Sequence, residues 1–227
     1  MALVLIPGFM LSDDLWSDLL PNLRKFGPVY HADPKVGDSI NSYALNLLKQ
    51  APNEFSLIAF SMGGYVAREI VRLAPKRVKK LILIATSNKG DTAAEALKKK
   101  NMVGDAIENF GGLSKQSIRN SLSPENASNQ ALIERVQRMG VDLGANVFIK
   151  QSSFVRVSDT PLLKSIDCPT LIVAGQHDRI RSKEEAEKLH VNIPNSKIVF
   201  LNTGHLIPLE APADLGRVIS EFINSSF

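Results

Sequence analysis

The stretch that decides the fold is FSLIAFSMGGYVAREIVRLAP, residues Phe55–Pro75. It opens with a run that is apolar but for one serine, as in a strand buried on both faces of a parallel sheet. From Val66 to Ala74 the apolar residues recur on one helical face, and Pro75 predicts the end of the helix. Ser61 lies between strand and helix, where only a sharp turn fits. The pattern predicts a strand–turn–helix unit with Ser61 at the carboxyl end of the strand.

Five further apolar runs of strand length are spread over the chain. Helical patterns separate them, and SKEE at Ser182–Glu185 is a capping box that predicts a helix start. Strands that alternate with helices form a doubly wound, mostly parallel sheet. We therefore predict an α/β fold with a sheet of about six strands, in a single domain that spans residues 1–227. The further runs are ALVLI from Ala2, VYHA from Val29, LILIA from Leu81, TLIVA from Thr170 and KIVFL from Lys197.

One interval breaks the alternation of strands and helices. Roughly eighty residues separate LILIA from TLIVA, far more than an ordinary connection contains. The interval has helical periodicity, for example at Leu132, Val136 and Met139, and glycines that would separate short helices. We predict a helical cap, residues 88–160, inserted between two core strands. A separate small domain is the alternative, but no Pro/Ser-rich linker frames the interval.

The composition limits the classes of protein to consider. The formal net charge is +4, and the densest basic cluster, LKKK at Leu97–Lys100, is too short to indicate nucleic-acid binding. The single cysteine, Cys168, excludes an internal disulfide and is typical of a reducing compartment. No run approaches the roughly 18 apolar residues of a membrane span. We expect a cytoplasmic protein without membrane contact, metal or organic cofactor, since neither a Cys/His cluster nor a phosphate-binding glycine loop is found.

Ser61 stands in a pattern that favours catalysis. A serine hydroxyl is a good nucleophile only when a base takes its proton and donors stabilise the oxyanion that forms. A sharp corner before a helix lifts the hydroxyl clear of the backbone, and it requires small neighbours, here Ala59, Gly63 and Gly64. Ala59–Gly63 is the G-x-S-x-G pattern with alanine in the first glycine position. The alternative interpretation of Ser61 is a helix N-cap.

An acid and a base should follow Ser61 in the chain, each past the end of a strand. Among the histidines, His205 lies between the last strand and the last helix, which suits a base above the sheet edge. Asp178, in AGQHDRI, follows the preceding strand and would orient the imidazole. A surface histidine and a turn aspartate are the alternatives. We predict structural or solvated roles for His31, His177 and His190, and we consider Asp91, Asp159 and Asp167 poorly placed for the acid.

Two backbone amides would complete the reaction centre by binding the oxyanion. Met62 supplies one at the start of the helix, and Phe9 supplies the other in the loop IPGFML after the first strand. Gly8 would let this loop pass close to the substrate. Pro7 stands where histidine precedes the glycine in a common pattern, so one side chain that could order the loop is missing.

The substrate pocket would lie between the sheet and the cap. Its predicted lining is apolar and adaptable. Arg156 would hold a carboxylate if the substrate were an anion. Lys98, Lys99 and Lys100 could dock an acidic substrate or an anionic carrier protein, or they form a solvated helix face. The residues predicted to line the pocket are Phe9, Met10, Met62, Met139 and Phe148.

Together these motifs resemble the α/β-hydrolase superfamily over essentially the whole chain. PGFMLSDDLW is similar to its oxyanion loop, AFSMGGYVA to its nucleophile elbow, VAGQHDRI to its acid loop and NTGHLIPLEAP to its histidine loop. The family usually has an antiparallel hairpin before the oxyanion-loop strand. This chain starts on that strand at Ala2, so the resemblance implies a trimmed sheet. Dehalogenases and epoxide hydrolases carry aspartate at the elbow and are set aside because of Ser61.

Small carboxylesterases are the most similar branch, including those that cleave pimeloyl-carrier-protein methyl ester. The resemblance implies a serine hydrolase that cleaves carboxylic esters of small to medium acyl chains through an acyl-enzyme intermediate. Enol-lactone hydrolases and carbon–carbon bond hydrolases have the same motifs and remain alternatives. A non-catalytic ligand-binding protein of this fold is an alternative of another class, although such proteins typically lack a triad member. The sequence predicts no oligomeric state.

Overall fold

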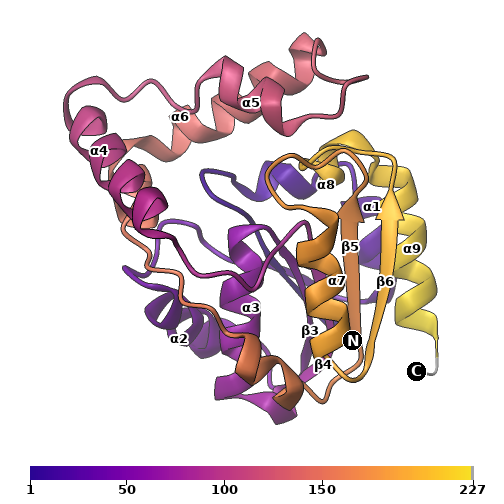
Figure 1. Cartoon of the computed structure of the whole chain (residues 1–227). Coiled ribbons are helices and arrows are strands. Elements are labelled where there is room, and N and C mark those ends of the chain that lie inside the picture. Colours follow the sequence, from indigo (N-terminus) through magenta and orange to yellow (C-terminus); the bar gives the residue numbers. More distant parts are fainter. Residues whose placement is uncertain (226–227) are drawn as a thin grey trace.

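The core of the molecule is a six-stranded sheet in the order β2-β1-β3-β4-β5-β6 (Figure 1). The computed structural model describes residues 1–225, apart from the side chains of residues 105–109. All five neighbouring strand pairs run parallel. The predicted α/β fold with a parallel sheet is therefore confirmed. The strands are β1 (Ala2–Ile6), β2 (Val29–His31), β3 (Phe55–Phe60), β4 (Val78–Ile84), β5 (Thr170–Gly175) and β6 (Ser196–Leu201).

The inner strands are largely buried, and the two edge strands are not. Every residue of β3 and β5 is buried, as expected where helices cover both faces of a sheet. In β2, by contrast, Tyr30 is 42% exposed, and β6 is only partly buried. An edge strand has a neighbour on one side only, so its side chains meet water. The strands at the two edges of the sheet are thus more exposed to solvent than the strands at its centre.

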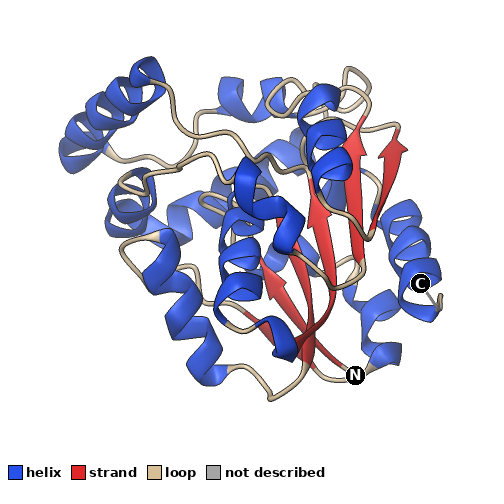
Figure 2. Cartoon of the chain, turned by 60° about the horizontal axis from the view of Figure 1, so that its bottom comes forward, coloured by secondary structure: helices blue, strands red, loops and turns tan. Residues whose placement is uncertain are grey.

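Helices cover both faces of the sheet (Figure 2). Besides shorter helices and the segment between β4 and β5, three helices contribute apolar residues to the cluster on one face, and two contribute to the cluster on the other face. The first three are α2 (Ile40–Gln50), α3 (Met62–Leu73) and α7 (Lys183–Asn192), and the other two are α1 (Leu20–Leu23) and α9 (Pro212–Asn224). The short helices are η1 (Asp13–Trp16), η2 (Arg24–Phe26), η3 (Pro75–Arg77), η4 (Thr160–Ser165) and α8 (Ile207–Glu210).

Local sequence features set several helix ends. The capping box predicted at the start of α7 is present, because Ser182 and Glu185 each accept a hydrogen bond from the other's backbone N–H. Helix α3 ends at Leu73, and Pro75 opens the 3-10 turn η3, since proline cannot continue an α-helix. Among the described residues, no helix is both long enough and apolar enough to cross a membrane.

Between β4 and β5 the chain forms helices that lie over the carboxyl ends of the strands (Figure 1). They are α4 (Ala93–Asn109), α5 (Lys115–Ser121) and α6 (Gln130–Ser152). Gly144 interrupts α6 with a φ of 80° and a ψ of 172°, a conformation that favours glycine. Residues 88–160 are called the cap below. The cap lies above the carboxyl ends of the strands, which is where ligands bind in parallel sheets.

Candidate active site

Ser61 occupies a strained corner between β3 and α3. Its φ is 51° and its ψ is −112°, which is sparsely populated for a residue with a Cβ. Neighbouring β4 holds the corner: Ser61 N donates to Ile84 O over 2.9 Å, and Thr86 Oγ1 donates to Ser61 O over 2.7 Å. The side chain of Ser61 makes no capping hydrogen bond to α3. The N-cap interpretation therefore does not account for this hydroxyl.

The glycines after Ser61 allow close packing of the corner. A Cβ on Gly63 would lie 2.5 Å from Ile6 O and 2.6 Å from Pro7 O, and one on Gly64 would lie 2.3 Å from Thr86 Oγ1. These are contacts that real Cβ atoms do not make. Gly63 lets α3 begin directly beside the end of β1 and the loop that follows it, and Gly64 lets the helix pass close to the side chain of Thr86, just after β4. The small residues expected from the sequence pattern are thus required by the packing.

His205 and Asp178 meet Ser61 above the sheet edge. Ser61 Oγ lies 3.0 Å from His205 Nε2, and His205 Nδ1 lies 2.7 Å from Asp178 Oδ2. The backbone N–H groups of Ile180 and Arg181 donate to Asp178 Oδ1 over 2.7 and 2.9 Å. The Asp178 side chain is 1% exposed, so its orientation is fixed by these partners. The three residues predicted from chain order therefore form one continuous hydrogen-bonded chain.

The cap also contacts the histidine loop. His205 N donates to Ser121 O, at the end of α5, over 2.7 Å. A Cβ on Gly204 would lie 2.4 Å from Leu122 C and Ser123 N, so only glycine permits this approach. On its other side the His205 ring packs against Phe60, with ring centroids 5.1 Å apart. The position of the imidazole therefore depends on core and cap together.

The other three histidines have polar or peripheral surroundings. His177 Nε2 lies 2.8 Å from Asn202 Oδ1, and His190 Nδ1 lies 2.9 Å from Ser196 Oγ. His31 lines a small separate cavity of about 80 Å³ near the β2 edge, and burial lowers its pKa. These positions agree with structural or solvated roles.

Two of the aspartates that were set aside as the acid form ion pairs elsewhere. Asp159 Oδ2 accepts from Arg68 Nε over 2.7 Å, and Asp91 Oδ2 accepts from Lys99 Nζ over 2.6 Å. The third, Asp167, accepts a hydrogen bond from Asn195 through its backbone carbonyl.

Within the described residues, no group of three or more His, Cys, Asp or Glu side chains could hold a metal ion.

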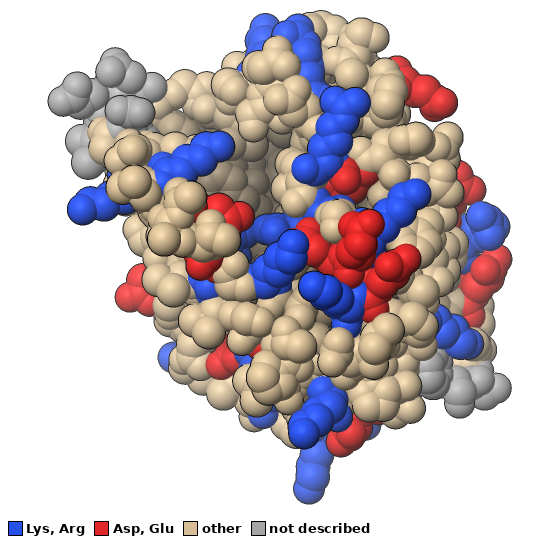
Figure 3. Space-filling view, in the orientation of Figure 1, with Lys and Arg blue, Asp and Glu red and all other residues tan. Residues whose placement is uncertain are grey.

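A cavity of about 360 Å³ lies beneath the cap and reaches Ser61 and His205. Figure 3 shows the hollow on this face, with charged side chains gathered below it. Phe9 and Met62, whose amides were predicted to bind the oxyanion, both line the cavity. Most of the remaining wall is apolar and comes from core and cap alike, with Leu113, Ile118, Val136, Phe60, Leu11 and Leu206 among its members.

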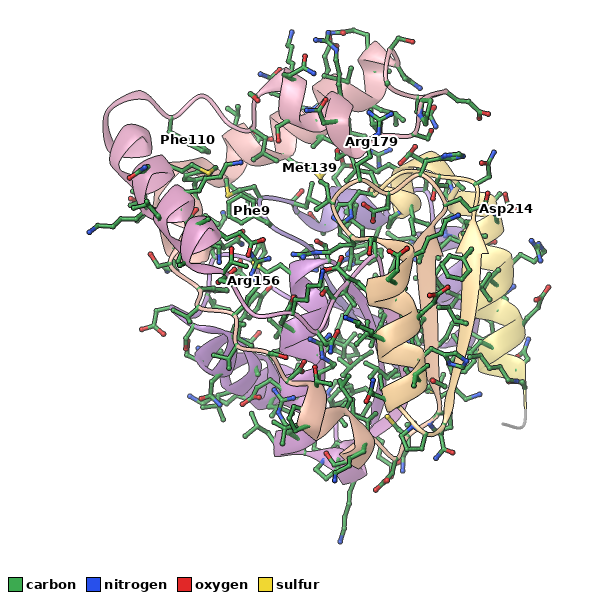
Figure 4. The ribbon with its side chains drawn as sticks, in the orientation of Figure 1. Phe9, Phe110, Met139, Arg156, Arg179 and Asp214 are labelled. Carbon is green, nitrogen blue, oxygen red and sulfur yellow. The ribbon has the colours of Figure 1, made fainter. Side chains whose placement is uncertain are left out.

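Three of the predicted pocket residues lie behind this wall. Of the described side chains that line the cavity, none belongs to Met10, Met139 or Phe148. Met10 and Phe148 pack with Val147 in a separate apolar cluster, and Met139 belongs to the larger cluster on the α9 face of the sheet. Figure 4 shows Met139 and Phe9 beneath the cap helices. Helical periodicity indicated that Met139 is buried, but the sequence could not tell which neighbours surround Met10, Met139 or Phe148.

Arg156 lines the cavity, but its charge is already partnered. Its Nε donates to Asp91 Oδ1 over 2.8 Å, and its backbone N donates to Asp91 Oδ2 over 2.9 Å. Burial alone would raise the pKa of Asp91, but the hydrogen bonds from Lys99 and Arg156 outweigh it and hold that pKa below its ordinary value. Burial lowers the pKa of Lys99. Two cations thus share one carboxylate at the side of the cavity.

The structure adds residues that the sequence did not single out. Gln151 and Arg181 line the cavity, and Gln151 is only 2% exposed. Lys99, one of the three lysines predicted as a possible site for an acidic group, lines the cavity as well. Arg181 Nε is buried without a hydrogen-bond partner among the described residues. For Gln151 an indication existed in the sequence, because it falls on the same helical face as Val147 and Phe148. A polar residue in an apolar stripe is expected to have a buried partner.

Known proteins share both the sequence pattern and the fold. The family model for the alpha/beta hydrolase fold matches residues 32–212. A pimeloyl-[acyl-carrier protein] methyl ester esterase of Aromatoleum aromaticum is 25% identical, with 97% of each chain aligned.

Two solved structures have the same architecture. One is a thermophilic esterase from Thermogutta terrifontis, studied with malate bound, which has a TM-score of 0.86 and 24% identity over 98% of this chain and 89% of that one. The other is an enol-lactonase from Burkholderia xenovorans LB400, with a TM-score of 0.82 and 15% identity over 99% and 91%. At these identities the two structures indicate a common fold.

Proposed function

Because the chain belongs to the alpha/beta hydrolase fold family, we propose that it is a serine hydrolase that cleaves carboxylic esters of small to medium acyl chains through an acyl-enzyme. The observation that carries the proposal is the hydrogen-bonded chain from Ser61 through His205 to Asp178. Ser61 and His205 line a cavity whose wall is mostly apolar. Relatives that are named as esterases support the proposal that the bond cleaved is an ester.

The first half of the reaction forms the acyl-enzyme. Ser61 Oγ attacks the ester carbonyl carbon while His205 Nε2 takes the hydroxyl proton. Asp178 accepts from Nδ1–H, which fixes the tautomer and stabilises the imidazolium. The carbonyl oxygen becomes an oxyanion that the Phe9 and Met62 N–H groups bind. When the tetrahedral intermediate collapses, His205 gives its proton to the departing alcohol oxygen.

The second half releases the acid. A water molecule attacks the acyl carbon and loses a proton to His205 Nε2. The second tetrahedral intermediate expels Ser61 Oγ, which recovers that proton, and the carboxylic acid leaves. The enzyme returns to its starting state without a redox step or an additional reactant.

The cavity supports an acyl group of small to medium length. A space of about 360 Å³ is at the lower end of the range of ligand pockets. Its apolar wall would bind the hydrocarbon chain, and the cap above it would keep bulk water from the acyl-enzyme. The charged residues of the wall are Glu95, Lys99, Arg156 and Arg181, of which Lys99 and Arg156 are joined through Asp91.

This excess of cations favours a second substrate class, an anionic ester or an enol-lactone acid. Arg156 and Lys99 share Asp91. Arg181 Nη1 lies 3.8 Å from Glu185 Oε1, while its Nε has no hydrogen-bond partner among the described residues. A substrate carboxylate could bind there. An acyl carrier protein is a candidate partner, since relatives are named for such a substrate and Lys98 and Lys100 are exposed on α4. A screen of esters, thioesters, lactones and vinylogous diketones would distinguish these substrate classes.

The proposal is tested first at the nucleophile. A fluorophosphonate probe should label Ser61, identified by peptide mass spectrometry, and Ser61→Ala should abolish labelling and turnover while the circular dichroism spectrum is unchanged. His205→Ala should lower kcat by about 10³-fold or more, because the base and the nucleophile act as a unit. Ser153→Ala is the matched control, since Ser153 is exposed at the end of α6, and it should retain both properties.

Two results would contradict the proposal. Labelling at a residue other than Ser61, or turnover that persists in Ser61→Ala, would refute the mechanism. If the native protein neither reacts with the probe nor hydrolyses any compound of the screen, the non-catalytic binding protein becomes the better interpretation.

A further inference from the structure

Gln151 joins the cap to the loop that carries Phe9. Its Oε1 accepts a hydrogen bond from Met10 N over 2.8 Å, across 141 positions of the chain. Its Nε2 donates to Pro34 O over 3.0 Å. The side chain is buried and both of its polar atoms are used. An amide held at both ends in this way has one orientation, so it fixes the position of the N–H that it binds.

The Met10 N–H depends on this acceptor. Met10 is fully buried, at 0% exposed, and a buried N–H without a partner is costly. Its φ of 54° lies in the left-handed region that a long side chain rarely adopts. A strained conformation persists only where the surroundings enforce it. The hydrogen bond from Met10 N to Gln151 is the polar contact that helps to hold this conformation.

Apolar contacts from the same helix support the loop from the same side. The ring of Phe148 meets the ring of Phe9 edge-on, with centroids 5.4 Å apart. Phe148 and Val147 also pack with Met10. These residues belong to the part of α6 that follows the interruption at Gly144. One short helical segment of the cap therefore contacts two consecutive residues of the oxyanion loop.

The loop has few internal restraints of its own. Pro7 has no N–H and no polar side chain, and the hydrogen bond that closes the turn, from Leu11 N to Gly8 O, is long at 3.4 Å. A Cβ on Gly8 would lie 2.8 Å from the Phe60 ring, so the loop passes tightly over the core without a polar anchor there. The orientation of the Phe9 peptide must then be set from outside the loop.

We propose that Gln151 is a positioning residue for the oxyanion hole: by binding Met10 N it orients the preceding amide, Phe9 N, toward the reacting carbonyl oxygen. This inference rests on the proposed function, because it assumes an acyl-transfer reaction at Ser61. It makes oxyanion binding a joint property of core and cap. An enzyme whose cap segment 145–152 moved away would keep its nucleophile and base but lose transition-state stabilisation.

The test replaces Gln151 by methionine, which has a similar size and no amide. Because the lost interaction acts on the transition state, kcat should fall about 10- to 100-fold, while KM should change less than about threefold. Binding of an alkyl boronic acid, which forms a tetrahedral adduct with Ser61, should weaken by a similar factor. Binding of the product acid should be unchanged.

Two further variants separate positioning from packing. Gln151→Glu keeps an oxygen that can accept from Met10 N, and it should recover most of the lost kcat. Lys150→Ala is the matched control, because Lys150 is the adjacent residue and its Nζ donates to Lys35 O, in the same loop as Pro34, over 2.9 Å. It removes a contact between cap and core without affecting residues 7–11, and it should retain native kcat.

The outcomes are distinct. If native turnover is present and Gln151→Met loses no more kcat than Lys150→Ala, or changes only KM, the inference is wrong and the proposed function stands. Equal loss in Gln151→Met and Gln151→Glu would likewise refute positioning through Met10 N. If the native protein has no turnover at all, the proposed function fails, and this inference fails with it.

Discussion

The nucleophile corner and the oxyanion loop lie side by side, yet they are held in different ways. Core backbone and small residues fix Ser61: β4 supplies Ile84 O, and Gly63 allows contact with β1. Cap side chains fix Phe9 and Met10, through Gln151 and Phe148. The contacts that hold Ser61 thus come from the buried sheet. The contacts that hold Phe9 and Met10 join the loop after β1 to α6 of the cap, which is far away in the sequence.

This contrast indicates which parts of the candidate site can vary independently. In the proposed mechanism the Ser61 hydroxyl is held by the core, and α5 of the cap supports the histidine loop through Ser121 O. Binding of the oxyanion would depend on a different part of the cap, the end of α6 that carries Gln151. A change in the cap can therefore alter substrate range and kcat while the nucleophile remains intact. Perturbations at the boundary of core and cap should reveal whether the two regions are as separable as their contacts suggest.

The largest effect is expected at the buried ion pair between α3 and the chain leaving the cap. Arg68 is fully buried, with a side chain 0% exposed, and pairs with Asp159, whose side chain is 10% exposed. Arg68→Met leaves Asp159 without its main partner, so the free energy of unfolding in urea should fall by about 3–5 kcal/mol. Because Ser61 is held by β3 and β4, fluorophosphonate labelling of the folded variant should be nearly unchanged.

Two kinds of variant serve as controls for this prediction. One removes the other member of the Arg68–Asp159 ion pair, and the other removes ion pairs on the surface. Asp159→Asn should be similarly destabilising, and the double variant should be more stable than the sum of the two losses predicts. Arg217→Ala removes ion pairs with Asp214 and Glu221 on the surface of α9, where the Arg217 side chain is 59% exposed. This variant should lower the free energy of unfolding far less than Arg68→Met does, because exposed ion pairs contribute little to stability. If Arg68→Met lowered the free energy of unfolding no more than Arg217→Ala does, the ion pair between Arg68 and Asp159 would not stabilise the fold.

A smaller effect concerns how the cap receives the acyl chain. Each methylene buried against the apolar wall contributes about 0.8 kcal/mol, or roughly a fourfold gain in kcat/KM. Activity on p-nitrophenyl esters should therefore rise from acetate to a short or medium chain and fall once the cavity is full. The alkaline hydrolysis rates of the same esters serve as the control for intrinsic reactivity. A flat profile together with fast lactone turnover would favour the anionic substrate class instead.

The smallest effect is expected at Asp91, which links α4 to the end of the cap. Its pKa is held below the ordinary value in the folded protein. The carboxylate therefore stabilises the fold above about pH 4, and this contribution is lost as the pH falls through the folded-state pKa. Asp91→Asn should be less stable than the native protein by about 1 kcal/mol at pH 7, and the difference should shrink near pH 3.

The measurement is urea unfolding of both proteins at each pH. Asp214→Asn is the control, because the Asp214 side chain is 62% exposed and lies on α9, across the molecule from Arg156, the partner of Asp91 (Figure 4). It should match the native protein at both pH values. A stability gap for Asp91→Asn that stays constant or grows toward low pH would contradict the assignment.

Much of the fold could be predicted from short-range patterns. A buried run such as β5, and the capping box at Ser182, reflect burial and backbone geometry that a few neighbouring residues determine. Helix ends followed from proline and serine chemistry for the same reason. The exposure of β2 did not follow from the sequence, because a strand's place in the sheet depends on which strands pair with it.

The proximity of Ser61, Asp178 and His205 could be predicted for a related reason. The parallel sheet brings every strand's carboxyl end to one edge, so residues just past those ends meet in space although they are far apart in sequence. Chain order and a steric need for glycine then singled out Ser61, Asp178 and His205. Their proximity is a consequence of topology, which the pattern of strands and helices already contained.

The cap contacts were decided by the tertiary structure. Helical periodicity indicates that Met139 is buried, but the neighbours that surround Met139 and Phe148 depend on how α6 packs over the core. The partner of Gln151 lies 141 positions away, and Arg156 is bound by Asp91 rather than left available. Such pairings arise from the packing angle of helices, which depends on many side chains at once and leaves no local pattern in the sequence.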